Sequence, residues 1–209
     1  MKVNLNKVKF VKGSDFQLSK SYVLDLYHLA GEITLNRSKR SASEVVRFKD
    51  DPKLGGFIYP IMQLLDPCYL EADVSFGGID QRGIYMLGRE VLPKFKKRTI
   101  TSVFTPLLPG LTGNKMSASD ETSKIDILDT EKEVKDKIKS AYCPVGEIEN
   151  NGVLAFIENV IFSLNNKLVI KRDKKFGGNL VYNNYKELEK GIEYLKYSSF
   201  RINDIYKRH

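Results

Sequence analysis

The sequence has few residues that could build a metal or disulfide site. Its 209 residues include two cysteines, two histidines and no tryptophan. Cys68 and Cys143 lie far apart and no CxxC pair is present, so we expect no zinc site and two free thiols in a reducing compartment. His28 and His209 are also far apart. The chain is therefore expected to hold no metal of its own.

Long apolar segments are absent as well. No apolar run approaches the length that spans a bilayer. Residues 1–12 alternate basic and apolar side chains and lack the continuous apolar core of a signal peptide. We therefore expect a soluble cytoplasmic protein with no membrane contact.

Basic residues exceed acidic ones, which gives a formal net charge of +8. Such an excess suits a polyanionic partner such as nucleic acid, because neutralising phosphates supplies affinity that does not depend on base sequence. A solvated basic surface is the alternative, and the charge alone does not decide between the two.

The chain before residue 70 is expected to be largely helical. Residues 36–40 are polar and basic, which predicts a connector. Apolar residues over 57–65 recur at helical spacing and predict a buried helix. The Asp66-Pro67 pair is expected to end this helix, because proline cannot continue the backbone hydrogen-bond ladder.

The next segments have the pattern of a parallel α/β sheet. A short strand is expected over 72–76, followed at once by Gly77-Gly78. A helix from about 80 to 92 follows, and 100–104 is expected to be the next strand. A strand, glycine turn and helix in succession is typical of a parallel sheet.

Helices are expected again in the second half. A charged helix over 131–142 precedes a break near 143–151, and an apolar stripe over 154–164 predicts another helix. The break divides the chain into an α/β domain, residues 1–146, and a small α-helical domain, residues 147–209.

The loop at 109–119, Pro-Gly-Leu-Thr-Gly-Asn-Lys-Met-Ser-Ala-Ser, is the most informative stretch. Ser117 and Ser119 supply hydroxyl donors, and Lys115 can stabilise the charge that develops on a leaving pyrophosphate. The spacing is not that of a P-loop. The run that begins Lys115-Met116 resembles the KMSKS signature of class I aminoacyl-tRNA synthetases. A solvated surface loop is the alternative.

Three polar residues share one face of the otherwise apolar helix. Tyr59, Gln63 and Asp66 are four and three residues apart. Buried polar groups are costly unless they are hydrogen-bonded, so this face needs partners. A satisfied network in the core would explain any one of them. All three together, beside a turn that carries Asp80 and Gln81, favour a ligand site.

Three segments resemble the tyrosyl-tRNA synthetases of archaeal and eukaryotic type. They are YPIMQLLD at 59–66, GGIDQR at 77–82 and SKIDILD at 123–129. With the KMSAS loop they follow the order and spacing of that family. The resemblance implies the back part of a class I Rossmann-like catalytic domain, followed by part of a helical anticodon-binding-like domain.

The resemblance implies roles for the polar residues. Asp66 would accept a hydrogen bond from the phenol of tyrosine, while Tyr59 and Gln63 would hold its amino group. Gln81 would orient the amino acid, and Asp80 the ribose of the adenylate. Tryptophanyl-tRNA synthetases often carry KMSAS too but lack this arrangement, which favours tyrosine as the substrate.

The resemblance also implies how ATP would be held. Gly78 would let the backbone approach the nucleotide, and Met116 and Lys115 would bind ATP. Lys115, Ser117 and Ser119 would act in catalysis, with Mg²⁺ brought by ATP. The implied reaction is that of a tyrosine–tRNA ligase, which joins tyrosine to AMP and then transfers it to tRNA-Tyr.

One signature of the family is missing. The HIGH motif has two histidines three residues apart, and no such pair occurs here. Lys115 would then grip the triphosphate from one side only, so we expect a fragment that is inactive alone. A non-catalytic tRNA-binding remnant, or one half of a split synthetase that docks with a separate N-terminal half, are the alternatives.

The resemblance also implies contacts with tRNA. Lys175 and Phe176 belong to a segment that is similar to the family segment whose aromatic residue stacks on an anticodon base. A core aromatic is the alternative for Phe176. Arg40 lies in the region of the connective insertion, which touches the acceptor stem and supplies the dimer contact in the family. A homodimer is therefore a further expectation, and a solvated basic surface explains Arg40 equally well.

Overall fold

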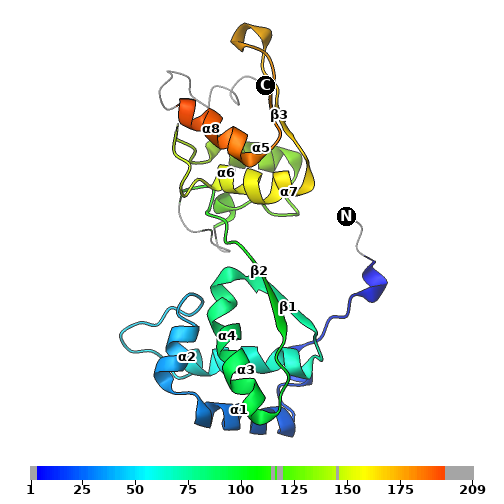
Figure 1. Cartoon of the computed structure of the whole chain (residues 1–209), viewed down its shortest axis with the longest axis vertical. Coiled ribbons are helices and arrows are strands. Elements are labelled where there is room, and N and C mark those ends of the chain that lie inside the picture. Colours follow the sequence, from blue (N-terminus) through cyan, green and yellow to red (C-terminus); the bar gives the residue numbers. More distant parts are fainter. Residues whose placement is uncertain (1–3, 114–115, 117–119, 145, 196–209) are drawn as a thin grey trace. The chain divides into compact units, whose positions relative to one another are not determined.

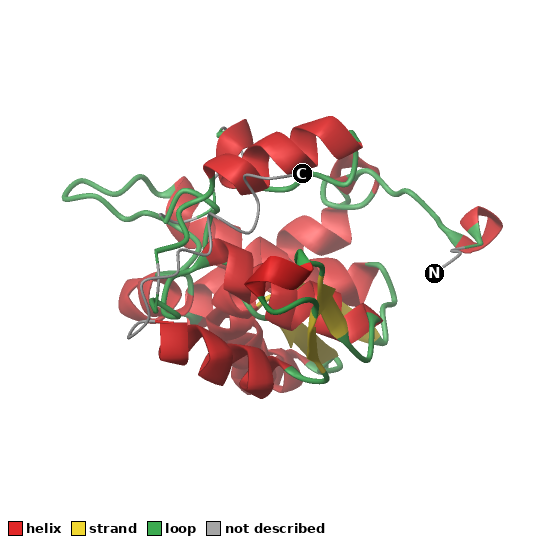
Figure 2. Cartoon of the chain, turned by 90° about the horizontal axis from the view of Figure 1, so that it is seen from above, coloured by secondary structure: helices red, strands yellow, loops and turns green. Residues whose placement is uncertain are grey.

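The computed structural model describes residues 4–113, 116, 120–144 and 146–195, without the side chains of residues 5, 176 and 193–195. It divides into two compact units, Met1–Leu107 and Leu108–His209. Figure 1 shows the elements of each unit, and Figure 2 shows that helices predominate over strands among the described residues. The domain boundary predicted near residue 146 separates the part of a catalytic domain from the small helical domain, and it stays a prediction.

The first unit combines helices with a parallel pair of strands. Its helices are α1 (Lys20–Glu32), α2 (Leu35–Ser41), α3 (Gly55–Tyr69) and α4 (Arg82–Val91). Its strands are β1 (Val74–Gly78) and β2 (Thr101–Thr105). Short 3-10 turns are η1 (Leu5–Lys7), η2 (Gly13–Asp15), η3 (Ile79–Gln81) and η4 (Leu92–Phe95). The α/β class with a parallel sheet is therefore confirmed.

Helix α3 is longer than the sequence pattern predicts. It spans Gly55–Tyr69 and passes through Pro67, so the prediction that Asp66-Pro67 ends it is wrong. Pro67 lies in the last turn and is buried, and there it removes a single backbone hydrogen bond. As a consequence, Asp66 stays on the same helix as Tyr59 and Gln63.

Residues 36–40 belong to α2, so their prediction as a connector is also wrong. Thr34 caps this helix, because its hydroxyl accepts a hydrogen bond from the Arg37 backbone amide. Ser38 is buried in it and donates a 2.6 Å hydrogen bond to the Phe57 carbonyl of α3. A polar residue such as Ser38 can therefore be buried, because a backbone carbonyl accepts its hydrogen bond.

The apolar core of the first unit lies where the four helices meet. Its buried members share helical spacing within α1, α3 and α4, as expected for helices that bury one stripe of side chains. They are Tyr22, Leu29, Ile33, Ala42, Ile61, Leu64, Leu65, Ile84, Leu87, Val91 and Leu92.

Strands β1 and β2 pair in parallel, with Phe76 opposite Val103. On one face of the pair, Phe104 packs against Tyr85 of α4, with ring centroids 5.8 Å apart. The other face carries Val74, Phe76 and Val103, which are 54%, 73% and 45% exposed. The described residues therefore leave one face of this sheet bare. This is unusual, because parallel sheets are normally covered on both faces.

The second unit contains helices and one hairpin. Its helical elements are η5 (Glu121–Ser123), α5 (Glu131–Ser140), α6 (Gly152–Phe156), the π-helical segment η6 (Ile157–Ile161), α7 (Phe162–Leu164), η7 (Lys174–Phe176) and α8 (Tyr185–Leu195). Strands β3 (Leu168–Ile170) and β4 (Leu180–Tyr182) pair antiparallel around η7, a hairpin that the sequence pattern did not predict. Leu154, Leu188 and Ile192 form a buried apolar cluster in the second unit.

Two glycines in helices of the first unit test this packing. A Cβ on Gly83 would lie 2.5 Å from the Ser41 carbonyl oxygen, whereas a Cβ on Gly31 would meet nothing within 4 Å. We expect Gly83→Ala to lower the free energy of unfolding by roughly 1–3 kcal/mol, because α4 would be pushed away from α2. Gly31→Ala should be neutral or stabilise by up to about 1 kcal/mol. Urea unfolding of both variants measures this, and equal effects would contradict the close approach of α2 and α4.

Candidate functional site

The polar face of α3 meets the turn that follows β1. Gln63 Nε2 donates a 2.7 Å hydrogen bond to Gln81 Oε1, at the end of η3. Tyr59 and Asp66 lie one turn to either side of Gln63 on the same helix. The structure therefore brings together two motifs that are 18 residues apart in the sequence.

Gln63 also carries an unsatisfied atom. Its Oε1 is buried and has no hydrogen-bond partner among the described residues. A buried acceptor without a donor is costly and uncommon in folded proteins, so a water molecule or a bound group is expected to donate to it. A ligand with an N–H donor, such as an amino group, would satisfy it.

Asp66 is held by two donors from a distant part of the chain. Gln17 Nε2 and the Tyr22 hydroxyl lie 2.9 Å and 2.7 Å from the same oxygen, Asp66 Oδ1. The Tyr22 hydroxyl also lies 3.1 Å from the Met62 carbonyl oxygen. Neither Gln17 nor Tyr22 is part of a motif, so sequence reasoning missed both.

The described first unit thus gathers all three glutamines of the sequence at one place. Gln17 contacts Asp66, and Gln63 contacts Gln81. Nothing in their spacing along the chain predicts this arrangement. A signal that could have suggested Tyr22 is its inward position on α1, although that position alone indicates only a core residue.

The surroundings of Tyr22 keep its hydroxyl protonated. Its side chain is fully buried, and its ring packs edge-on against Tyr69 and Phe16 at centroid distances of 4.9 Å and 5.8 Å. Burial raises the pKa of Tyr22 far above its ordinary value of 10.0, and the hydrogen bond to the Asp66 carboxylate raises it further. Tyr22 is therefore a hydrogen-bond donor at any physiological pH.

Tyr59 and Asp80 are positioned more openly. Tyr59 is 43% exposed, and burial of the rest of its side chain raises the pKa of its hydroxyl. Asp80 is half-buried in η3, directly after β1. A Cβ on Gly78 would lie 2.5 Å from Asp80 Oδ1, so a larger residue at this position would displace the Asp80 side chain.

Comparison with known proteins places the chain in a family. The sequence matches the model of the class I tRNA synthetases of W and Y type over residues 2–199. The chain belongs to this family. It is 50% identical to the tyrosine–tRNA ligase of Haloarcula marismortui over 186 residues, which is 87% of this chain and 54% of that protein. Against the cytoplasmic tyrosine–tRNA ligase of Danio rerio it is 48% identical over 90% of this chain and 36% of that protein.

Solved structures agree with this class I synthetase assignment. The tyrosyl-tRNA synthetase of Archaeoglobus fulgidus, complexed with L-tyrosine, has a TM-score of 0.81 and 42% identity. The match covers 97% of this chain and 63% of that one. The resemblance to tyrosyl-tRNA synthetases of archaeal and eukaryotic type is thereby confirmed, and the chain spans about half or less of the length of these curated relatives.

The residues of the KMSKS-like loop are not part of the α3 site as the structure describes it. Lys115, Ser117 and Ser119 fall outside the described residues, and Met116 between them is exposed. Met116 belongs to the second unit, whereas the α3 site belongs to the first.

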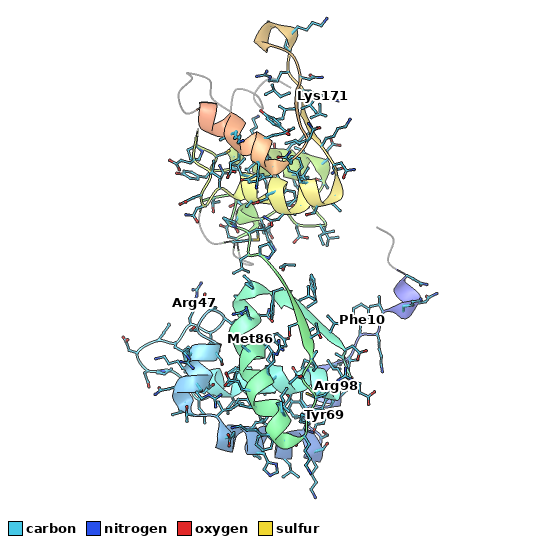
Figure 3. All side chains as sticks on the ribbon, in the orientation of Figure 1. Phe10, Arg47, Tyr69, Met86, Arg98 and Lys171 are labelled. Carbon is cyan, nitrogen blue, oxygen red and sulfur yellow. The ribbon has the colours of Figure 1, made fainter. Side chains whose placement is uncertain are left out.

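The residues predicted to contact tRNA also lie in both units. Arg40 is exposed in α2, and Lys175 is exposed in η7. The side chain of Phe176 is not described. Figure 3 labels Arg47 in the first unit and Lys171 beside the β3–β4 hairpin, two further basic residues.

Clusters of metal-ligating residues and membrane-spanning helices are absent from the described residues. No group of three or more His, Cys, Asp or Glu among them could hold a metal ion. Cys68 and Cys143 are free thiols. No described helix is long and apolar enough to cross a membrane.

The raised pKa of Tyr22 has a measurable consequence. The pKa of Tyr22 is higher in the folded state than in the unfolded state. The contribution of this shift to the free energy of unfolding is therefore fully present below pH 10.0 and is lost as the pH rises further. We expect the wild type to lose more stability than Tyr22→Phe between about pH 8 and about pH 11. Denaturant unfolding across this range measures it.

The control for this experiment is Tyr27→Phe, which removes the hydroxyl of a tyrosine that is 68% exposed. Its stability should fall with rising pH as that of the wild type does. Parallel pH profiles for the wild type and Tyr22→Phe would show that the hydroxyl is not buried beside Asp66.

Proposed function

We propose that this chain forms the tyrosine-recognising and KMSKS-bearing part of a tyrosine–tRNA ligase. The complete reaction joins tyrosine to AMP with Mg·ATP and transfers it to tRNA-Tyr. The observation that carries the proposal is the α3 face, where Asp66 and Gln63 lie on one helix and Gln63 contacts Gln81. The unsatisfied Gln63 Oε1 adds a need for a donor. We further propose that the protein acts in the cytoplasm.

Each polar residue has a role that its position supports. Asp66 accepts a hydrogen bond from the substrate phenol, and the unpaired Gln63 Oε1 accepts one from the ammonium group, with Tyr59 beside it. Gln81 orients the amino acid through its contact with Gln63. Asp80 holds the ribose of the adenylate.

The nucleotide is proposed to bind at the glycine turn and the KMSKS-like loop. Gly78 has no Cβ, which leaves the backbone open to the nucleotide next to Asp80. Lys115 stabilises the pyrophosphate leaving group, assisted by Ser117, Ser119 and Met116. Mg²⁺ enters with ATP. Since this loop grips the triphosphate from one side, the chain alone is proposed to be inactive.

A second candidate function is that of one half of a split synthetase. The bare face of the parallel sheet favours it, because Val74, Phe76 and Val103 are exposed on a kind of sheet that is normally covered. An N-terminal half that adds strands and a covering helix would bury them. This surface favours an assembling half over a solitary tRNA-binding remnant.

Contacts with tRNA are proposed for both units. Lys175 and Phe176 lie in η7, at the tip of the β3–β4 hairpin, and Lys174 precedes them. Basic and aromatic side chains at a hairpin tip suit a single-stranded RNA loop. Arg40 on α2 is proposed to meet phosphate of the acceptor stem, and a homodimer is the proposed assembly.

Activation of tyrosine tests the proposed function. We expect no tyrosine-dependent exchange of labelled pyrophosphate into ATP by the chain alone, and exchange once the front half of a relative's catalytic domain is added as a separate polypeptide. Lys115→Ala and Asp66→Ala should lower the restored exchange by about 100-fold or more, since each removes a group that holds a reacting charge or the substrate.

Matched controls are Lys132→Ala and Asp73→Ala, which change exposed residues away from both motifs. They should leave the restored exchange unchanged. Exchange by the chain alone would contradict the need for a second half. Restored exchange that survives both site variants would contradict the assigned residues.

A further inference from the structure

Two hydrogen bonds meet on one oxygen of Asp66. Gln17 Nε2 and the Tyr22 hydroxyl both lie within 2.9 Å of Oδ1. Within the described ranges no hydrogen bond or ion pair reaches the second oxygen, Oδ2. A carboxylate can accept hydrogen bonds on both oxygens, so this arrangement fills one oxygen and leaves the other for a donor from outside.

Both donors are themselves held in place. The ring of Tyr22 packs against both Phe16 and Tyr69, which restricts movement of its hydroxyl away from α3. The Gln17 backbone amide donates a 2.8 Å hydrogen bond to the Gly13 carbonyl. A Cβ on Gly13 would lie 2.6 Å from Gln17 Oε1, so glycine there leaves room for the amide.

We propose that Gln17 and Tyr22 are positioning residues that fix the rotation of the Asp66 carboxylate and so present Oδ2 to the substrate phenol. This inference rests on the proposed function. A carboxylate that is held in one rotation accepts a hydrogen bond without first losing side-chain freedom, and preorganisation of this kind favours binding. Selectivity for tyrosine over phenylalanine then depends on Gln17 and Tyr22 as well as on Asp66.

A purely structural role for these bonds is the alternative, and the two make different predictions. A structural bond would hold α1, or the segment just before it, against α3, so its loss would weaken tyrosine and phenylalanine binding alike. A positioning bond acts on the phenol only, because phenylalanine offers no hydroxyl to Oδ2. The ratio of the two affinities therefore separates positioning from packing.

The test uses the full chain with Tyr22→Phe and Gln17→Met, which remove each donor and keep the size of the side chain. Calorimetry measures tyrosine affinity, and displacement of tyrosine measures phenylalanine affinity. We expect each variant to lower the tyrosine-to-phenylalanine affinity ratio by about tenfold, as for loss of a hydrogen bond to a charged group. Phenylalanine affinity should stay unchanged.

The matched control is Tyr69→Phe. It removes the same hydroxyl from the ring that packs on Tyr22, but that hydroxyl donates to Asp25 at 2.5 Å and not to Asp66. The affinity ratio should therefore match that of the wild type.

Each remaining outcome decides between the hypotheses. An unchanged ratio in Tyr22→Phe and Gln17→Met would overturn the positioning role while leaving tyrosine recognition intact. Absence of tyrosine binding by the folded wild type would instead overturn the proposed function. Should Tyr22→Phe fail to fold, as judged by circular dichroism, Gln17→Met decides the outcome alone.

Discussion

The two-sided character of α3 is the constraint on which the first unit depends. At 100° per residue, Ile61, Leu64 and Leu65 point to the side of the helix opposite Gln63 and Asp66. The apolar side forms the core with α1 and α4. The polar side can be buried only if other segments bring partners to it, and Gln17, Tyr22 and Gln81 supply them.

These partners are unevenly distributed, and this distinguishes a ligand site from an ordinary core network. Asp66 Oδ1 receives two donors, whereas the buried Gln63 Oε1 receives none among the described residues. A network that served folding alone would be expected to pair its acceptors. The imbalance leaves the buried Gln63 Oε1 in need of a donor from outside the described residues, which is what the proposed binding of tyrosine would supply.

Patterns among residues close together in the sequence predicted which side chains share a helix face, but they did not predict contacts between distant segments. Helical periodicity placed Tyr59, Gln63 and Asp66 on one face of a helix. The strand predicted at 72–76 is displaced, because β1 spans Val74–Gly78 and includes the glycine pair, so the turn to α4 begins only at Ile79. Residues 36–40 were missed because a helix of polar residues depends on its Thr34 cap and on contacts with α3. The contact of Gln17 with Asp66 joins residues 49 apart, and no local pattern encodes such a distance.

The central claim is that tyrosine binds on the polar face of α3. The sequence has three glutamines, and all of them lie at this site. Selective ¹⁵N labelling of glutamine therefore gives side-chain amide signals that report on this site alone. Titration with tyrosine should shift the signals of Gln63 and Gln81, and titration with alanine should have a much smaller effect. Signals that do not move when tyrosine is added to the folded protein would contradict the claim.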